Sequence, residues 1–381
     1  MTHIAIVTTS FPTDNSGAEA AGTFVADFAD ELSSRAEVTV LAPGRNHQIE
    51  DNKSYKTIRF AVPRLPLSLL SPLNPADWFY IYQTIKSGQH VIKESYLKSP
   101  YDYIFALWTL PSGYWAWQMM RRHHIHYSIW ALGSDIWSLG KLPIVRSVLK
   151  KVLQDSQICF ADGYQLKKDV ELMAGRECRF LASTRKLDVT HKKCTRTNPP
   201  YRLTFIGRWH FNKGVDLLID GLARLEKCDW EKIEEILICG GGPLQEKIFQ
   251  SVEKLQKQGH PVVTKGYQNK LQATEILLKS DYVLIPSRKE SIPIIFSDAL
   301  QCGVPVVTTH VGDFPLLLNK YKAGILASGV SSLSYCMAIK KSLDTSPEEF
   351  KVGLGLAAKE FNMSSIVDYF MESIDSKTDI H

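Results

Sequence analysis

The chain has 381 residues, of which 44% are hydrophobic, 22% charged and 10% aromatic. These are ordinary values for a globular protein, and they exclude coiled-coil, collagen-like and low-complexity classes. At about 150 residues per domain the length indicates two domains or one large one. The net charge of +5 is too small, and the charges too evenly mixed, to favour a nucleic-acid partner.

The cysteines and the N-terminus indicate a reducing cytoplasm. The seven cysteines include no Cys-x-x-Cys pair, so they resemble neither a disulfide framework nor a zinc site. The N-terminus has no basic segment and no long apolar run, and is predicted to be a strand and not a signal peptide. Residues 103–120 carry no charge, but Pro111 and Gly113 interrupt them, so we expect a strand, a loop and a helix in place of a membrane span.

Short β-branched runs alternate with helical patterns along the chain, which is typical of a parallel sheet covered by helices. In the first half the predicted strands are 4–9, 37–42, 103–107, 126–131 and 158–161. Helices are predicted over about 22–34 and after Pro143, where apolar residues recur at helical spacing.

Residues 182–200 are polar and basic without periodicity, so this segment is predicted to join two domains. The alternation then resumes. The predicted strands are 201–206, 235–239, 261–264, 282–286 and 304–308, and the predicted helices are 215–225, 245–257, 271–279 and 296–302. We therefore expect an α/β fold with two doubly wound domains, 1–190 and 198–363, although the sequence has no internal repeat.

The loop after strand 201–206 combines Gly207, Arg208 and Lys213 just before a helix. Open α/β sheets bind ligands where their strands end. A guanidinium can bond two phosphate oxygens at once, an ammonium adds a point charge, and helix N–H groups add partial positive charge. The loop therefore suits an anion such as a phosphate, with a solvated basic loop as the alternative.

Two more loops at strand ends carry candidate ligand contacts. The glycine turn 240–242 allows close backbone approach, but no third spaced glycine completes a dinucleotide fingerprint, which counts against NAD. Glu290 lies in the next loop, and Asp298 follows it by about two helical turns. Two carboxylates that face one cleft can accept hydrogen bonds from sugar or ribose hydroxyls, and two solvated surface acids are the alternative.

These loops occur together with further motifs in one order and spacing. In the second half the set comprises Gly207-Arg208 with Lys213-Gly214, the turn 240–243, Lys265-Gly266-Tyr267, the segment 281–287, Glu290 with Asp298, and the segment 302–307. In the first half it comprises Ser10-Phe11-Pro12, the segments 22–25 and 108–113, and Gly133-Ser134-Asp135. The set resembles the retaining glycosyltransferases of family 4 over nearly the whole chain. The resemblance implies the GT-B architecture of two facing Rossmann-like domains with a cleft between them, and a helix at about 364–381 that returns to the first domain.

The resemblance also implies a nucleotide-sugar donor, no metal ion, and roles for residues of the second domain. Arg208 and Lys213 would neutralise the donor diphosphate and the charge that grows on the leaving nucleotide, and Glu290 would bind hydroxyls of the donor sugar. The other donor-binding positions are Gly207, Gly241, Gly242, Tyr267, Ser291, Ile292, Ile294 with Ile295, and Asp298. Asp298 would bind the ribose, but the family usually has the longer glutamate there, so this contact needs a closer helix or a bridging water.

In the first domain the resemblance assigns acceptor-side positions. They are Gly17, Gly22, Trp108, Ser134 and Asp135. Where the family often has histidines this chain has Leu107 and Leu132, so no histidine there can polarise the donor or the acceptor. Asp135, just after a strand, is the candidate for an acceptor contact, with helix capping as the alternative.

The stretch 121–151 suits an anionic membrane surface. It holds six basic residues and three histidines but only one acid, Asp135, and six of the eight tryptophans lie in the first half of the chain. Aromatic and basic side chains together are typical of the water–lipid boundary. Core packing or sugar stacking is the alternative for each tryptophan.

The resemblance thus leads us to expect a cytoplasmic hexosyltransferase, peripheral on the inner face of the membrane. It would move a hexose from a nucleotide sugar to a hydroxyl of a saccharide or lipid-linked saccharide in envelope, exopolysaccharide or lipopolysaccharide synthesis. UDP is favoured as the commonest donor base of the family, with GDP and ADP open. We expect no cofactor and no nucleic-acid partner. The alternatives are a catalytically silent nucleotide- or glycan-binding scaffold and a related nucleotide-sugar epimerase.

Overall fold

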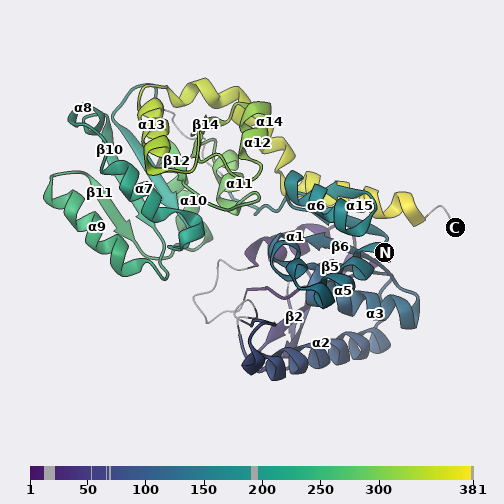
Figure 1. Cartoon of the computed structure of the whole chain (residues 1–381). Coiled ribbons are helices and arrows are strands. Elements are labelled where there is room, and N and C mark those ends of the chain that lie inside the picture. The colour runs from purple at the N-terminus through teal and green to yellow at the C-terminus, as the bar shows by residue number, and fades with distance from the viewer. Residues whose placement is uncertain (13–21, 53, 66, 68–69, 190–195, 379–381) are drawn as a thin grey trace. The chain divides into compact units, whose positions relative to one another are not determined.

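The computed structural model describes residues 1–12, 22–52, 54–65, 67, 70–189 and 196–378. It consists of two compact units, which Figure 1 shows. Unit 1 is Met1–Ala182 with Ile366–His381, and unit 2 is Ser183–Ser365. Each unit has its own sheet and its own covering helices, so each is described by itself.

Unit 1 is built on an eight-stranded sheet in the order β3-β4-β2-β1-β5-β6-β7-β8. The strands are β1 (His3–Val7), β2 (Glu37–Gly44), β3 (Gln48–Asp51), β4 (Lys56–Ala61), β5 (Tyr103–Leu107), β6 (His126–Ala131), β7 (Ile158–Ala161) and β8 (Cys178–Phe180). Strands β3 and β4 pair antiparallel and the other neighbours pair in parallel. In this register Ile6 lies between Val40 and Phe105. Since β1 lies between β2 and β5, the winding direction reverses at the β1/β5 edge, where sheets of this kind bind ligands.

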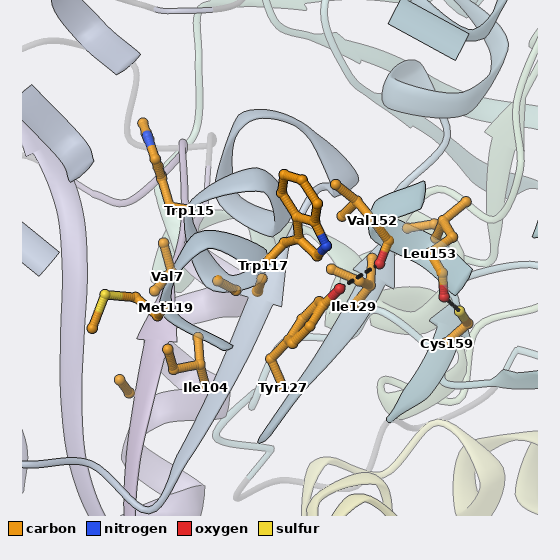
Figure 2. Packing of buried hydrophobic residues seen from close by; sticks show 14 of the residues in the cluster. Val7, Ile104, Trp115, Trp117, Met119, Tyr127, Ile129, Val152, Leu153 and Cys159 are labelled. Atoms are coloured by element: carbon orange, nitrogen blue, oxygen red, sulfur yellow. Dashed lines mark hydrogen bonds between the residues drawn. The ribbon is translucent and has the colours of Figure 1, made fainter. Parts of the chain in front are cut away.

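Helices bury apolar side chains on both faces of this sheet. They are α1 (Thr23–Leu32), α2 (Trp78–Lys98), α3 (Tyr114–His123), α4 (Ser134–Trp137), α5 (Pro143–Gln154), α6 (Tyr164–Ala174) and α15 (Met363–Thr378). Successive strand side chains point to opposite faces. On one face Ile129 lies among Trp117, Val152 and Tyr127, whose hydroxyl donates to the Val152 carbonyl at 2.6 Å (Figure 2).

The other face of the first sheet is covered by helices from both ends of the chain. The ring of Phe105 lies 5.5 Å from that of Phe28 in α1 and 4.3 Å from that of Phe370 in α15, measured between centroids. The last described helix of the chain therefore completes the core of unit 1.

Unit 2 holds a six-stranded parallel sheet in the order β11-β10-β9-β12-β13-β14. The strands are β9 (Tyr201–Ile206), β10 (Ile233–Cys239), β11 (Val262–Lys265), β12 (Tyr282–Ile285), β13 (Val306–Thr308) and β14 (Gly324–Leu326). The helices are α7 (Val215–Leu222), α8 (Lys227–Trp230), α9 (Gln245–Lys257), α10 (Lys270–Lys279), α11 (Ile294–Gln301), α12 (Phe314–Tyr321), α13 (Ser332–Leu343) and α14 (Lys351–Glu360). Here the winding direction reverses between β9 and β12.

The boundary between the units lies after Ala182, eight residues before the predicted end of the first domain at residue 190. The reason is that the segment 183–187 is bonded to α11. The Gln301 side-chain amide donates to Thr184 Oγ1 at 3.0 Å and to the Arg185 carbonyl at 2.8 Å, and it accepts from the Leu187 N–H at 3.3 Å. These residues therefore belong to unit 2.

Most predicted elements are confirmed, and four strands (β5, β6, β7 and β9) have the predicted bounds. The prediction omitted the strands β3, β4, β8 and β14. It also omitted the helices α4, α6, α8, α12, α13 and α14 and the 21-residue helix α2. Helix α2 was not predicted because its apolar residues are not confined to one face. Trp78, Phe79 and Tyr82 are exposed. Across the described ranges, no helix combines the length and apolarity that a membrane span requires.

Candidate functional site

Two loops meet where β9 and β12 end in unit 2. The first is the loop 207–214, which contains Lys213, and the second is the loop 286–293, which contains Glu290. The Lys213 ammonium donates to a Glu290 carboxylate oxygen, and both side chains keep part of their surface exposed, 36% and 16% respectively. Two of the three predicted catalytic residues are thus in direct contact at the point where the winding direction reverses.

Arg288 fastens the two loops together. Its guanidinium donates to both carboxylate oxygens of Asp216 at 2.7 and 3.0 Å, donates to the Phe211 carbonyl at 2.9 Å, and lies 4.1 Å from the centroid of the Phe211 ring. Burial raises the pKa of Asp216, but the bonds from Arg288 outweigh burial and the pKa is lowered on balance. Sequence reasoning missed Arg288 and Asp216, although the charged run Arg288-Lys289-Glu290 was a signal.

The loop 207–214 can lie against the end of β12 only because residue 214 is a glycine. Gly214 has φ 69°, in the left-handed region, and a Cβ built there would lie 1.8 Å from the Pro286 carbonyl oxygen. Any other residue would push the two loops apart. This close approach brings Lys213 to Glu290.

Arg208, the third predicted catalytic residue, is exposed, and its guanidinium makes no hydrogen bond or ion pair with any residue that the structure describes. Its carbonyl accepts from the His210 N–H at 2.9 Å. Its neighbour Trp209 is buried, and the Trp209 N–H donates to the Gly241 carbonyl at 2.7 Å. The backbone of Arg208 is therefore held in place while its guanidinium points to solvent, an arrangement that suits capture of an anion.

The glycine turn 240–242 serves protein packing. The Tyr267 hydroxyl donates to the Gly241 carbonyl at 2.7 Å, and a Cβ on Gly241 would lie 2.9 Å from the Tyr267 ring. The Gly207 N–H donates to the Cys239 carbonyl at 3.1 Å, and a Cβ on Gly242 would lie 2.8 Å from the Trp209 carbonyl oxygen. The space that these glycines leave open is thus occupied by neighbouring loops and by Tyr267, where the sequence had suggested a ligand.

The start of α11 presents polar groups beside Glu290. Ser291 and Ile292 are buried, and the Ser291 hydroxyl has no hydrogen-bond partner among the described residues. Pro293 caps the helix and Ile294 begins it, with Ile295 following. The first turn of a helix leaves its N–H groups without partners inside the helix, which suits an anion or a hydroxyl.

Asp298 lies further along α11 and has a different environment from the one we expected. Its side chain is 0% exposed and forms an ion pair with Arg185, which is 12% exposed and whose Nε lies 3.3 Å from Asp298 Oδ1. In this structure the carboxylate anchors the segment 183–187, so a ribose contact would require Arg185 to leave. No sequence signal pointed to Arg185, which is 113 residues away from Asp298 along the chain.

In unit 1 the buried carboxylate of Asp135 lies where β5 and β6 end. It accepts from the Thr109 N–H at 2.6 Å and from the Leu132 N–H at 3.4 Å, which joins the loops after β5 and β6. Burial raises the pKa of Asp135, and the backbone bonds oppose that change. Beside it Ser134 is exposed.

Trp108 and the glycines complete the acceptor-side positions. Trp108 has φ 68°, a conformation that costs an aromatic residue energy and that is concentrated at functional sites. Gly22 precedes α1, and its carbonyl accepts from the Val25 N–H at 3.0 Å. Gly17 lies outside the described residues. Within the part of the chain that the structure describes, no group of three His, Cys, Asp or Glu side chains is placed to hold a metal ion.

Known proteins are similar to the second half of this chain in sequence and to the whole chain in fold. Residues 200–344 match the family model of the glycosyl transferases group 1. Unit 2 carries a group 1 glycosyl transferase domain. This group 1 domain contains the loops 207–214 and 286–293 and the anchored carboxylate of Asp298. One curated relative is the D-inositol 3-phosphate glycosyltransferase of Corynebacterium diphtheriae, 23% identical over 165 residues, 42% of this chain and 39% of that protein. The chain thus spans about two fifths of that relative's length.

Solved structures match over the whole chain. Sucrose-phosphate synthase from Thermosynechococcus elongatus matches with a TM-score of 0.75 at 15% identity, with 99% of each chain covered. Anabaena HepE, solved in complex with UDP and with UDP-glucose, matches with a TM-score of 0.69 at 15% identity, covering 99% of this chain and 100% of that one. The chain that carries the group 1 domain therefore has the GT-B fold.

Proposed function

We propose that this protein is a retaining, metal-independent glycosyltransferase that passes a hexose from a nucleotide sugar to a hydroxyl of a saccharide or lipid-linked saccharide. The observation that carries the proposal is the cluster of Arg208, Lys213 and Glu290 at the β9/β12 edge of the group 1 domain. It offers two cations to a diphosphate and one carboxylate to sugar hydroxyls. A role in envelope or exported-polysaccharide synthesis is part of the proposal.

The cluster supplies electrostatic stabilisation where charge develops. As the bond between the sugar and the diphosphate breaks, negative charge grows on the leaving phosphate. Arg208 and Lys213 stabilise that charge in the place that a metal ion takes in other transferases. In the structure the Glu290 carboxylate accepts from Lys213. When the lysine bonds the donor phosphate instead, the carboxylate is released to accept from the sugar hydroxyls. Ser291 and the N–H groups of Ile294 and Ile295 add donors.

UDP is the proposed donor base. Support comes from Anabaena HepE, which shares the fold and was solved with UDP and with UDP-glucose. The curated relative named as a D-inositol 3-phosphate glycosyltransferase supports a hydroxyl acceptor. GDP and ADP sugars remain comparison ligands in the test.

The first test is thermal stabilisation of the purified protein by UDP, GDP, ADP and their sugars. Selective binding raises the melting temperature by mass action, with about 2.7 kcal/mol of stabilisation at a ligand concentration of 100 Kd. We expect UDP compounds to stabilise the protein and Arg208→Ala to lose that effect. Arg224→Ala, an exposed arginine of the same unit, is the control and should behave as wild type. Indifference to all three bases would reject a donor site at this edge.

The second test is transfer by the purified protein in the presence of EDTA. Removal of one preorganised charge-stabilising group typically costs about 100- to 1,000-fold in rate, so Arg208→Ala and Glu290→Ala should each lose transfer by at least about 100-fold. NMR of the product reports whether the anomeric configuration is retained. Binding without any turnover would identify a silent scaffold, and conversion of the donor sugar without an acceptor would identify an epimerase.

A further inference from the structure

A cavity of about 550 Å³ lies in unit 1 at the amino ends of its parallel strands. Glu37 begins β2 and Lys56 begins β4, while Asp51 ends the antiparallel strand β3, so all three mark this end of the sheet. The acceptor-side positions follow the carboxyl ends of the strands, at the opposite end. Sites for small molecules typically have volumes of about 300–1,000 Å³. The cavity is therefore large enough for a ligand and separate from the acceptor-side loops.

One face of the sheet forms the floor of this cavity. Asp51 and Thr39 are both register partners of Lys56, one on each neighbouring strand. Ile49 is the partner of Ile58, two residues away along the same pair of strands. Side chains alternate between the faces of a sheet, and register partners share a face. These five lining side chains therefore project from the same face.

The end of α2 covers the cavity on this face. Ile58 shares a core cluster with Val91 of α2, and Ser95, Lys98 and Ser99 from the end of that helix line the cavity. The last turn of a helix leaves carbonyl groups without partners inside the helix, and it carries partial negative charge. The end of α2 therefore offers hydrogen-bond acceptors and disfavours an anion.

The polar lining is balanced in charge and rich in hydroxyl groups. Glu37 and Asp51 supply two carboxylates, and Lys56 and Lys98 supply two ammonium groups. Among the residues that the structure describes, none forms a hydrogen bond or ion pair with the side chain of Asp51, Lys56 or Lys98. Hydroxyl and amide groups come from Ser33, Thr39, Asn52, Ser54, Ser95 and Ser99. This lining offers many donors and acceptors without net charge, which suits an uncharged polyol better than a phosphate or an amine.

His3 orients the hydroxyl of Thr39 in the floor. Its Nδ1 lies 2.9 Å from the Pro100 carbonyl oxygen, and its Nε2 lies 2.9 Å from Thr39 Oγ1. Because a carbonyl only accepts, Nδ1 carries the proton, and Nε2 of the neutral ring accepts from the Thr39 hydroxyl. The lone pairs of Thr39 Oγ1 are then left to accept from a ligand hydroxyl. Thr39 is 5% exposed, so this acceptor lies deep in the cavity.

Apolar side chains lie beside these polar groups. Ile49 lines the cavity and exposes 51% of its surface, next to the buried side chain of Ile58. Val38 of β2 also contributes to the lining. A sugar ring carries C–H groups as well as hydroxyls, so it can contact an apolar wall while its hydroxyls bond to polar groups.

We propose that this cavity binds an uncharged saccharide of one or two rings. The carboxylates and Thr39 accept from sugar hydroxyls, the lysines donate to them, and Ile49 contacts the C–H groups of the ring. The proposal goes beyond the transfer reaction, because the cavity shares no residue with the donor cluster or with the acceptor-side positions. It holds or fails whatever the donor is.

The experiment is a titration of the full chain with glucose, galactose, mannose, maltose and lactose, followed by saturation-transfer-difference NMR. We expect at least one sugar to bind. Glu37→Ala with Asp51→Ala should weaken that binding at least about tenfold, because the hydroxyls lose two charged acceptors. Ile49→Trp should abolish it, because the larger side chain takes the space of the ligand. All three side chains are exposed, so these variants should keep the wild-type melting temperature and its shift with UDP.

Matched controls make the same changes elsewhere in unit 1. Glu177→Ala with Glu372→Ala removes two exposed acids, and Ile144→Trp enlarges an exposed side chain of α5, all outside the cavity. These variants should bind the sugar as wild type does. Equal loss in controls and cavity variants would overturn the proposal. So would the absence of binding by all five sugars, or binding that both cavity variants leave unchanged, since the sugar then occupies another site.

Glucose 6-phosphate tests the preference for an uncharged ligand. Its cavity-dependent binding is the difference between wild type and Ile49→Trp, and it should be weaker than that of the best neutral sugar. Stronger cavity-dependent binding of the phosphate would contradict the proposal. Glu290→Ala should lose transfer but keep cavity-dependent sugar binding, so failure of the transfer proposal and failure of this one are distinguishable. If Ile49→Trp fails to fold, the paired change at Glu37 and Asp51 takes its place in each comparison.

Discussion

The two units fasten the loops at the ends of their strands in different ways. At the β9/β12 edge of unit 2, Lys213, Glu290 and Arg208 keep surface exposed, and Arg288 pairs with Asp216 to hold the loops. Where β5 and β6 of unit 1 end, the carboxylate of Asp135 is buried and accepts from backbone N–H groups. The comparison teaches that charges that remain exposed can serve a ligand, whereas a buried charge serves the fold.

The largest expected effect concerns Arg185 and Asp298, which are largely buried although the other site charges of unit 2 keep surface exposed. If this carboxylate serves the fold, Asp298→Ala should lower the free energy of unfolding by about 3–5 kcal/mol, because it leaves a buried guanidinium uncompensated. Urea denaturation measures the loss. Arg185→Ala combined with Asp298→Ala should cost clearly less than the sum of the single changes.

Nucleotide binding then decides whether Asp298 also serves a ligand. If the Asp298→Asn variant folds, we expect UDP to raise its melting temperature by about as much as it raises that of wild type. Two results would contradict the distinction between buried and exposed charges. One is that the unfolding free energies lost in Arg185→Ala and Asp298→Ala add up to the loss in the double variant. The other is that Asp298→Asn loses the UDP-induced shift in melting temperature.

A smaller effect is expected from a matched pair of glycines, one in each unit. Gly214 and Gly175 both have φ 69°, but a Cβ on Gly214 would meet the Pro286 carbonyl, while a Cβ on Gly175 would meet nothing within 4 Å. Gly175→Ala should cost about 1 kcal/mol from the backbone conformation alone. Gly214→Ala should cost about 1–3 kcal/mol more, from overpacking.

The two alanine variants should also differ in nucleotide binding. Gly214→Ala displaces the loop that carries Lys213, so its UDP-induced melting shift should shrink, while that of Gly175→Ala should not. Equal unfolding free energies for the two variants would show that the loops at the β9/β12 edge are not closely packed.

The smallest effect is the pH dependence of Asp135→Asn. Burial raises the pKa of Asp135 in the folded state, so the folded protein holds this proton more tightly than the unfolded chain does. The stability that protonated Asp135 contributes is therefore complete at low pH and is lost as the pH rises through the folded-state pKa. Between about pH 4 and pH 8, the unfolding free energy of wild type relative to Asp135→Asn should fall.

Urea denaturation at a series of pH values measures this change, with Asp220→Asn, an exposed aspartate of α7, as the control. A wild-type advantage that grows with pH would show that the bonds from Thr109 and Leu132 outweigh burial. Asp135 would then resemble Asp216 of unit 2, whose pKa is lowered.

The donor-side loops could be predicted because their signals are local in sequence. A glycine and a cation between a strand and a helix, as at Gly207 and Lys213, can be recognised within eight residues. The contact between Lys213 and Glu290 follows from the parallel order of β9 and β12, which places both loops at one edge. Three strands of unit 1 had the predicted bounds because buried parallel strands form short, continuous apolar runs.

What could not be predicted depends on contacts between distant residues or on atypical surfaces. The pairing of Arg185 with Asp298 joins a segment without regular structure to a helix, and no spacing rule links them. Helix α2 was missed because exposed aromatic residues interrupt the spacing of apolar residues that marks a buried helix face. The environment of Asp135 required the tertiary structure, because a carboxylate after a strand looks the same in sequence whether it faces solvent or backbone N–H groups.

The packing of α15 into unit 1 has a consequence for how the chain is made. Phe370 fills space beside Phe28, Phe105 and Phe160, so the first unit lacks part of its core until α15 has emerged from the ribosome. Unit 2 is synthesised in between, and at about 5–20 residues per second this takes roughly ten to forty seconds. During that interval the nascent first unit exposes an apolar sheet face to chaperones, while unit 2 can fold as soon as Ser365 is free.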